Sequence, residues 1–340
     1  MFRTYLEKII KTVDLGEEEM FCMINEIFSG DLTDSQIGAF LAALATKGET
    51  FEELAGAARA MREKAVRIYT AVGLNVVDTC GTGGDGADTF NISTTVAFVV
   101  AGCGVPVAKH GNRSVSSLCG SADLLETLGV KLGTDAVMAE QSIANVGIGF
   151  MFAPVFHGAM RYAATARKEI GIRSIFNMVG PLSNPAGADF QVVGVYAPKL
   201  TEMFARALKR LGSKRAFVVH GHDGLDEISV CAPTRISELK DGNVTTYDIT
   251  PEAFFGKSAD STSLAGGNPE VNARITRQVL AGEKSPRRNV VLINASAALV
   301  AVGKAKDLSE GIRMAGDAID KGAAMEKLDR LIDFTQDISQ

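Results

Sequence analysis

The sequence has 340 residues, of which 46% are hydrophobic, and a formal net charge of -5 at pH 7. This length fits one large and one small domain of an ordinary water-soluble globular protein. The mildly acidic balance argues against a nucleic-acid partner, and no apolar run reaches the length that spans a bilayer, so we expect neither nucleic acid nor a membrane as partner.

The N-terminal segment is predicted to be helical to about Ala71. Its first eight residues mix charges of both signs without a long apolar core, so we expect no signal peptide and a cytoplasmic location. Leu6, Ile9 and Val13 recur at helical spacing. The run Asp31–Asp34 supplies an N-cap before the next apolar stretch.

Short apolar runs, often β-branched, then alternate with helical stretches. The expected strands are Leu74–Cys80, Val105–His110, Ile148–Ala153, Gln191–Ala197 and Arg215–Gly221. The expected helices are Ser121–Leu128, Asp135–Val146, Phe156–Ile170 and Leu200–Leu211. Repeated strand–helix–strand order predicts parallel pairing with right-handed crossovers.

The remainder is predicted to be a hairpin followed by helices. The hairpin turns near Asp241-Gly242-Asn243, and the helices cover Asn268–Leu280, Asn289–Val302 and Leu308–Lys321. The five cysteines are odd in number and lack Cys-x-x-Cys spacing, which argues against a disulfide framework and against structural zinc.

A glycine-dense turn follows the first expected strand. Gly81, Gly83 and Gly84 permit close backbone approach, so several N–H groups can converge on one anion. No lysine follows them as a Walker loop requires. Asp85 would repel a pyrophosphate unless a cation or a ribose hydroxyl intervened, which disfavours dinucleotide binding. By itself, such a motif can also be only a turn.

The loop from Lys109 to Ser117 packs two fixed cations, a histidine, an amide and three hydroxyls after the second expected strand. Lysine offers a point charge and arginine a planar fork to phosphate oxygens, so this density indicates a polyanion site. A solvated polar loop is the alternative. Ser121, at the start of the next helix, fits equally an N-cap and a phosphate donor.

Adjacent carboxylates at Asp226 and Glu227 follow the fifth expected strand. Oxygen ligands favour magnesium held jointly with substrate phosphates, although acids in loops are often simply solvated. The three loops follow strand ends, where open α/β sheets bind ligands, so we predict a magnesium-bound phosphorylated metabolite. No activated nucleophile accompanies them, and we expect no covalent catalysis.

A fourth segment, Phe152 to Pro185, mixes aromatic, proline and glycine residues around Arg167. Spacing alone leaves three roles open for Arg167: it binds a ligand, pairs with a nearby acid, or faces solvent.

Taken in order, these motifs resemble those of the anthranilate phosphoribosyltransferase family over nearly the whole chain. They are Gly81–Asp85, Asn91–Thr94, Lys109–Arg113, Gly120–Asp123, Asn177–Pro185 and the Asp226-Glu227 pair. The resemblance implies transfer of the phosphoribosyl group of 5-phosphoribosyl 1-diphosphate (PRPP) to anthranilate, which gives N-(5-phosphoribosyl)anthranilate and diphosphate in tryptophan biosynthesis. It also implies Mg²⁺ as cofactor.

The implied α/β fold is that of the nucleoside phosphorylase-like phosphoribosyltransferases, a small helical domain joined to a larger α/β domain with a mostly parallel sheet. The small domain would comprise residues 1–71 with helices near 157–176, and the large domain residues 72–156 and 177–340. A homodimer formed through the helical part is implied as well.

The resemblance also assigns site residues. Those implied to bind PRPP are Gly81, Gly84, Asp85, Thr89, Asn91, Ile92, Ser93, Thr94, Lys109, His110, Gly111, Asn112, Arg113, Ser114, Val115, Ser116, Ser117 and Ser121. Those implied to hold anthranilate are Gly81, Asn112 and Arg167, with His110 and His157 nearby. Ser93, Asp226 and Glu227 match magnesium-binding positions.

One residue departs from the family pattern, and two other functions compete. Gly158 stands where members often carry proline, which concerns the edge of the anthranilate site. A pyrimidine nucleoside phosphorylase would carry a different Lys/Ser/Gly signature and a longer chain. A nucleic-acid-binding paralogue would show a basic surface and damaged donor motifs, whereas this chain is acidic and keeps those motifs.

Overall fold

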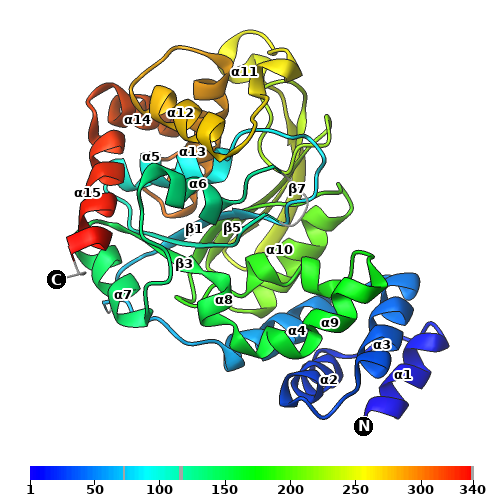
Figure 1. Cartoon of the computed structure of the whole chain (residues 1–340). Helices are drawn as coiled ribbons and strands as arrows, with labels where there is room; N and C mark the ends of the chain where they lie inside the picture. The colour runs from blue at the N-terminus through cyan, green and yellow to red at the C-terminus, as the bar shows by residue number, and fades with distance from the viewer. Residues whose placement is uncertain (72, 115–117, 338–340) are drawn as a thin grey trace.

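The computed structural model describes residues 1–71, 73–114 and 118–337. Its N-terminal part consists of α1 (Phe2–Ile10), α2 (Glu17–Ser29), α3 (Asp34–Lys47) and α4 (Phe51–Lys64), which lie together at one end of the molecule (Figure 1). Thr33 caps α3 and Thr50 caps α4, each paired in a capping box with the residue three positions on. The expected helices end at Lys64, before Ala71.

A seven-stranded sheet forms the centre of the rest of the chain, in the order β3-β2-β1-β4-β5-β6-β7. The four pairings from β3 to β5 are parallel and the two pairings that join β5, β6 and β7 are antiparallel, so the expected mostly parallel sheet is confirmed. The strands are β1 (Val77–Gly81), β2 (Val107–Gly111), β3 (Ile148–Phe152), β4 (Phe190–Gly194), β5 (Arg215–Gly221), β6 (Thr234–Lys240) and β7 (Asn243–Ile249).

Helices cover both faces of this sheet (Figure 1). They are α5 (Ile92–Gly102), α6 (Ser121–Leu128), α7 (Ala136–Asn145), α8 (Ala153–Phe156), α9 (Arg161–Ile170), α10 (Leu200–Arg210), α11 (Glu252–Phe255), α12 (Pro269–Leu280), α13 (Pro286–Ala301), α14 (Leu308–Asp320) and α15 (Ala323–Asp337). Short 3₁₀ turns cover Gly158–Met160, Ile175–Asn177, Gly180–Leu182 and Ser261–Leu264.

The helices differ from the expected ones in several places, and two of these differences have local causes. The expected helix Phe156–Ile170 is divided into α8, a 3₁₀ turn and α9, because His157 adopts non-helical angles between them. Helix α13 begins earlier than expected, since Ser285 caps it and Pro286 takes its first position. Helix α15 was not expected from the apolar spacing at all.

Side chains alternate between two apolar clusters across the sheet. Phe217 and Val219 of β5 pack with α5 and α13, whereas Ala216 and Val218 point to the opposite face. On that face the cluster continues without a break through α10 into α2, α3, α4 and α9. The helical part and the sheet therefore share one core.

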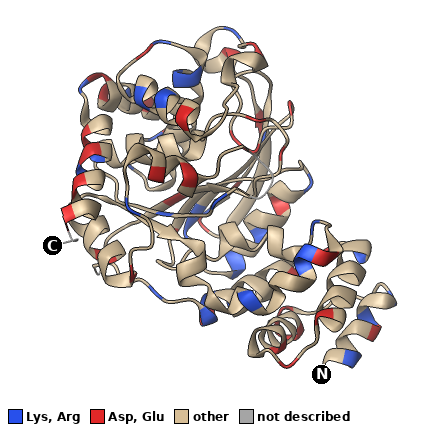
Figure 2. Cartoon of the chain, viewed as in Figure 1, with Lys and Arg blue, Asp and Glu red and all other residues tan. Residues whose placement is uncertain are grey.

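Charged residues of both signs occur close together on the helices in the view of Figure 2. An example is Arg59, whose Nη1 lies 3.1 Å from Glu17 Oε1 between α4 and α2. Both side chains are partly exposed, and ion pairs near the surface contribute little to stability, about 0–1 kcal/mol each. Within the described residues, no helix is both long and apolar enough to cross a membrane.

Candidate active site

The glycine loop after β1 is held against the acidic segment after β5. The Gly83 N–H donates to Asp226 Oδ2 over 2.9 Å, and the Asp226 N–H donates to Asp85 Oδ2 over 3.4 Å. A Cβ on Gly81 would lie 2.5 Å from Asp226 Oδ2, and one on Gly194 would lie 1.5 Å from the Asp226 carbonyl oxygen. The absence of side chains at these two strand ends is what admits Asp226.

Three carboxylates influence one another electrostatically there, those of Asp85, Asp226 and Glu227. Burial, followed by the charge of Asp85, raises the pKa of Asp226 to about 7. Burial and the neighbouring Asp226 raise the pKa of Glu227 well above its usual value, and Lys109 opposes this. Burial in turn lowers the pKa of Lys109. Acids that repel one another in this way favour a bound cation between them.

The donor set fits magnesium that is completed by a substrate. Asp226, Glu227 and the Ser93 hydroxyl offer only oxygen ligands. Across the described ranges, no three His, Cys, Asp or Glu side chains form a ready-made metal cage. Mg²⁺ usually keeps several waters and takes its remaining ligands from substrate phosphates, so a partial set of protein oxygens is what it requires.

Lys109 of β2 is buried and joins three elements. Its Nζ donates to the Thr79 carbonyl over 2.5 Å and to Ser93 Oγ over 3.4 Å. The Thr79 hydroxyl donates to the Ser93 carbonyl over 3.0 Å. The structure therefore brings the ends of β1 and β2 and the first turn of α5 together around one cation.

The remaining residues near the start of α5 are mostly engaged by the protein. The Asn91 amide donates to the Cys119 carbonyl over 2.9 Å and accepts from Asn272 over 3.0 Å. Thr89 pairs with Ala265 in an isolated β-bridge. The side chains of Ile92 and Thr94 are buried, so Ile92 has only its backbone to offer a ligand.

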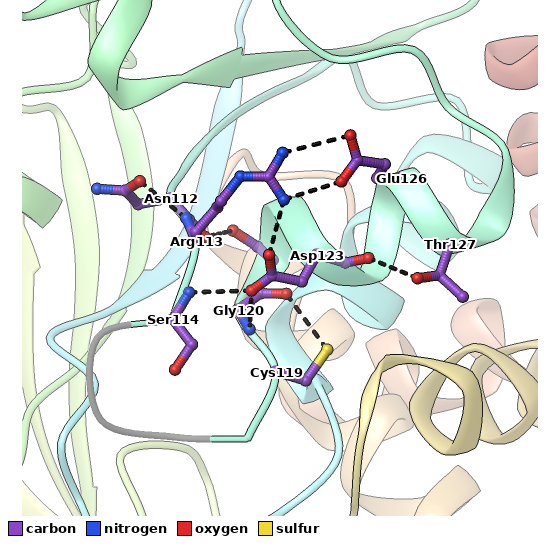
Figure 3. A network of polar contacts seen from close by, with 9 residues as sticks. Asn112, Arg113, Ser114, Cys119, Gly120, Asp123, Glu126 and Thr127 are labelled. Atoms are coloured by element: carbon purple, nitrogen blue, oxygen red, sulfur yellow. Dashed lines mark hydrogen bonds and ion pairs between the residues drawn. The ribbon is translucent and has the colours of Figure 1, made fainter.

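The loop between β2 and α6 is braced by an acidic residue (Figure 3). Asp123 Oδ2 accepts from the backbone N–H groups of Ser114, over 3.0 Å, and Gly120, over 2.9 Å. Arg113 Nη1 donates to Asp123 over 2.9 Å and to Glu126 over 2.8 Å. The Arg113 guanidinium is thus directed at α6, whereas the Lys109 ammonium contacts β1 and α5. The two fixed cations expected together in this loop therefore have different partners.

Two further residues of that stretch lie at the end of β2. The Ser121 hydroxyl donates to the Asn112 carbonyl over 3.2 Å. A Cβ on Gly111 would lie 2.2 Å from Ser121 Oγ, so glycine there makes room for the serine. Val115, Ser116 and Ser117, also expected in the site, lie outside the described residues.

The residues expected to hold anthranilate form two groups. His110 and His157 are buried with ring centroids 4.9 Å apart, and burial lowers the pKa of His110 to about 3 and that of His157 to about 4. Arg167 of α9 is half-buried, its Cζ lying 5.5 Å from the Phe176 ring centroid. Burial lowers the pKa of Arg167, and no acid pairs with it in the described part of the chain.

Models of two protein families match the chain. The model described as "Glycosyl transferase family, helical bundle domain" matches residues 3–65, and that described as "Glycosyl transferase family, a/b domain" matches residues 73–325. The anthranilate phosphoribosyltransferase of Desulfosudis oleivorans is 67% identical over 337 residues, which is 99% of each chain.

The chain belongs to the anthranilate phosphoribosyltransferase family. The crystal structure of anthranilate phosphoribosyltransferase from Thermus thermophilus is 42% identical with a TM-score of 0.92, covering 97% of this chain and 99% of that one. The solved structure of anthranilate phosphoribosyltransferase from Saccharomyces cerevisiae in complex with PRPP and Mg is 28% identical with a TM-score of 0.90, covering 99% of this chain and 98% of that one. These matches confirm the expected family, enzyme class and fold class.

Two contributors to the candidate site were missed from the sequence. Arg173 donates through Nη2 to the Gly84 carbonyl over 2.6 Å, and the Tyr196 N–H donates to Thr82 Oγ1 over 3.1 Å. Neither stands in a motif that carries chemistry. The signal that could have found Arg173 is its place two residues after Gly171, which ends α9 in the left-handed conformation.

Proposed function

We propose that the loops after β1, β2 and β5 are the place where this chain carries out its family's reaction. The chain transfers the phosphoribosyl group of PRPP to anthranilate, giving N-(5-phosphoribosyl)anthranilate and diphosphate, a step of tryptophan biosynthesis. The observation that carries the location is the contact of Asp226 with both the Gly83 N–H and Asp85, next in the chain to Glu227, on which the buried Lys109 acts electrostatically.

The proposed PRPP site offers more backbone N–H groups than the sequence analysis indicated. The N–H groups of Gly84, Asp85 and Gly86 have no hydrogen-bond partner within the described residues, so they are free to meet phosphate oxygens. Proposed PRPP-binding residues are Gly81, Gly84, Asp85, Thr89, Asn91, Ile92, Ser93, Thr94, Lys109, His110, Gly111, Asn112, Arg113, Ser114 and Ser121. Arg113 acts by fixing its loop to α6.

We assign a magnesium site to Asp226, Glu227 and the Ser93 hydroxyl, in keeping with the yeast relative that was solved with PRPP and Mg. When bound, Mg²⁺ neutralises charge on the diphosphate leaving group. The carboxylates must be ionised to ligate it, and Lys109 beside them helps to keep Glu227 ionised. The protein thereby holds opposite charges ready for a polyanionic donor.

The acceptor site is proposed at Gly81, Asn112, Arg167, His110 and His157. Arg167 offers a guanidinium fork without an acidic partner in the described ranges, which suits the anthranilate carboxylate. The lowered pKa values of His110 and His157 keep both imidazole rings uncharged at neutral pH. Uncharged rings do not repel a sugar carbon that becomes positive as the C1–O bond breaks.

No strong base is required for this transfer. The aromatic amine of anthranilate is uncharged at neutral pH, and its nitrogen attacks C1 once Arg167 has oriented the ring. The amine then loses one proton to water, and the electron pair of the broken C1–O bond leaves with diphosphate. The residues listed here bind, orient and neutralise, so none of them forms a covalent bond to substrate.

The decisive experiment follows anthranilate fluorescence after mixing with PRPP, with and without Mg²⁺. Magnesium-dependent loss of emission is expected, and Asp226→Asn is expected to abolish most of it. Asp241→Asn is the matched control, since Asp241 lies exposed in the β6–β7 turn. Unchanged emission from the folded parent protein, or equal activity of both variants, would refute the assignment.

The homodimer and the cytoplasmic location are further parts of the proposal. Met1, Ile10 and Val13 are 73%, 65% and 48% exposed beside α1, an apolar surface that a second copy would cover. Light scattering of the parent and of Ile10→Glu tests the dimer, because an added charge would disrupt it. All five cysteines are free thiols, in keeping with a reducing compartment, and cell fractionation tests the location.

A further inference from the structure

Arg173 connects two parts of the proposed site through a hydrogen bond and a contact with an aromatic ring. It follows α9, which carries Arg167, and its Nη2 donates to the Gly84 carbonyl over 2.6 Å. Its Cζ also lies 4.5 Å from the centroid of the Tyr196 ring. Arg173 thus stands between the proposed acceptor helix and the proposed donor loop.

Tyr196 contacts the same loop at a second residue. Its backbone N–H donates to Thr82 Oγ1 over 3.1 Å, and the Thr82 N–H donates to the Gly194 carbonyl over 2.9 Å. The glycine loop is therefore attached near Thr82 to the segment after β4 and at Gly84 to Arg173. Tyr196 contacts both attachments, through its backbone and its ring.

The contact with Gly84 orients a neighbouring donor. In a trans peptide the carbonyl and the following N–H lie in one plane and point in opposite directions. When Arg173 holds the Gly84 carbonyl, the Asp85 N–H is fixed facing away from Arg173. This N–H has no partner in the described chain, which leaves it free for a phosphate oxygen.

We propose that Arg173 is a positioning residue that couples the anthranilate helix α9 to the PRPP loop. The inference rests on the function proposed above. Arg173 lies six positions after Arg167, so a shift of α9 when Arg167 binds a carboxylate moves the guanidinium on Gly84 with it. Binding of the acceptor then stabilises the loop conformation that receives the donor, and each substrate increases the affinity for the other.

The test compares Arg173→Gln with Arg206→Gln. The Cζ of Arg206 in α10 lies 3.8 Å from the Phe51 ring centroid, so Arg206 likewise joins the helical part to the sheet-packed part, and none of its described contacts is with the glycine loop. We measure the KM for PRPP at low and saturating anthranilate. Loss of one charge-assisted hydrogen bond predicts about a fivefold higher KM for PRPP in Arg173→Gln, without the decrease that saturating anthranilate produces in the parent.

Two further variants separate positioning from simple stability. Arg173→Lys keeps a hydrogen-bond donor but loses the planar group that stacks on Tyr196, so it is expected to recover part of the coupling. Tyr196→Phe keeps the ring that Arg173 contacts, and Tyr196→Leu removes that ring. All are expected to melt within a few degrees of the parent. Coupling of parental size in Arg173→Gln, or equal loss in Arg206→Gln, would overturn the proposal.

Direct binding keeps this test distinct from the proposed function. Titration calorimetry with PRPP and Mg²⁺ measures donor affinity without any turnover. If the parent binds PRPP but transfers nothing, the proposed function fails. The role of Arg173 is still tested in that case, because it requires Arg173→Gln to bind PRPP more weakly than the parent. Equal PRPP affinity in parent and variant would refute the positioning role even if transfer is observed.

Discussion

Gly81→Ala is predicted to damage the site while sparing the fold. The added Cβ would lie 2.5 Å from Asp226 Oδ2 and 3.2 Å from its Cγ, whereas ordinary contacts begin near 3.4 Å. The carboxylate must therefore move by about 1 Å, and a displacement of this size can cost a reaction about 100-fold. Since φ of Gly81 is not positive, backbone strain adds nothing to this loss.

We expect kcat/KM for PRPP to fall about 100-fold, equivalent to about 2.7 kcal/mol of transition-state stabilisation. The melting temperature should change little, because the clash involves the end of a side chain. Gly194→Ala is the contrasting variant: its Cβ would lie 1.5 Å from a backbone oxygen, so the chain itself must shift and the protein should lose stability. Activity of Gly81→Ala within threefold of the parent would refute the reasoning.

Three other perturbations have defined outcomes. Arg167→Ala should raise the KM for anthranilate at least tenfold and that for PRPP much less, since its guanidinium is proposed to meet only the acceptor; equal increases would count against this. Asp123→Asn weakens the brace on the Ser114 and Gly120 N–H groups, and steady-state kinetics should show about a fivefold higher KM for PRPP. The folded pKa of Asp226, about 7, exceeds its ordinary 3.8, so as pH rises between these values the metal-free protein loses stability through this group. Mg²⁺ requires the ionised form, so scanning calorimetry should show a larger Mg²⁺-induced rise in Tm at pH 8 than at pH 6, and no such difference in Asp226→Asn.

The sequence predicted the five parallel strands and the loops that follow them, because apolar runs and glycine turns are local signals, although β4 ends at Gly194 and not at Ala197. The strand Arg215–Gly221 and the helix Ser121–Leu128 have the expected bounds. The ion pair between Arg113 and Glu126 was not predicted, since it joins residues 13 positions apart. Glu126 competes with any phosphate for the Arg113 guanidinium. Arg173 was missed for a similar reason: its contact with Gly84 joins residues 89 positions apart.

The uninterrupted apolar cluster across α2, α3, α4, α10 and β4 has a consequence for how the chain could be divided. Cutting between Lys64 and Val77 would expose Leu54, Ala58 and Met61 on one fragment and Phe204 on the other, all of which are buried together in the intact protein. Neither fragment would be a self-sufficient folding unit. The helical segment therefore belongs to the same cooperative transition as the sheet, and amides of α4 and β4 should exchange with solvent at similar free energies.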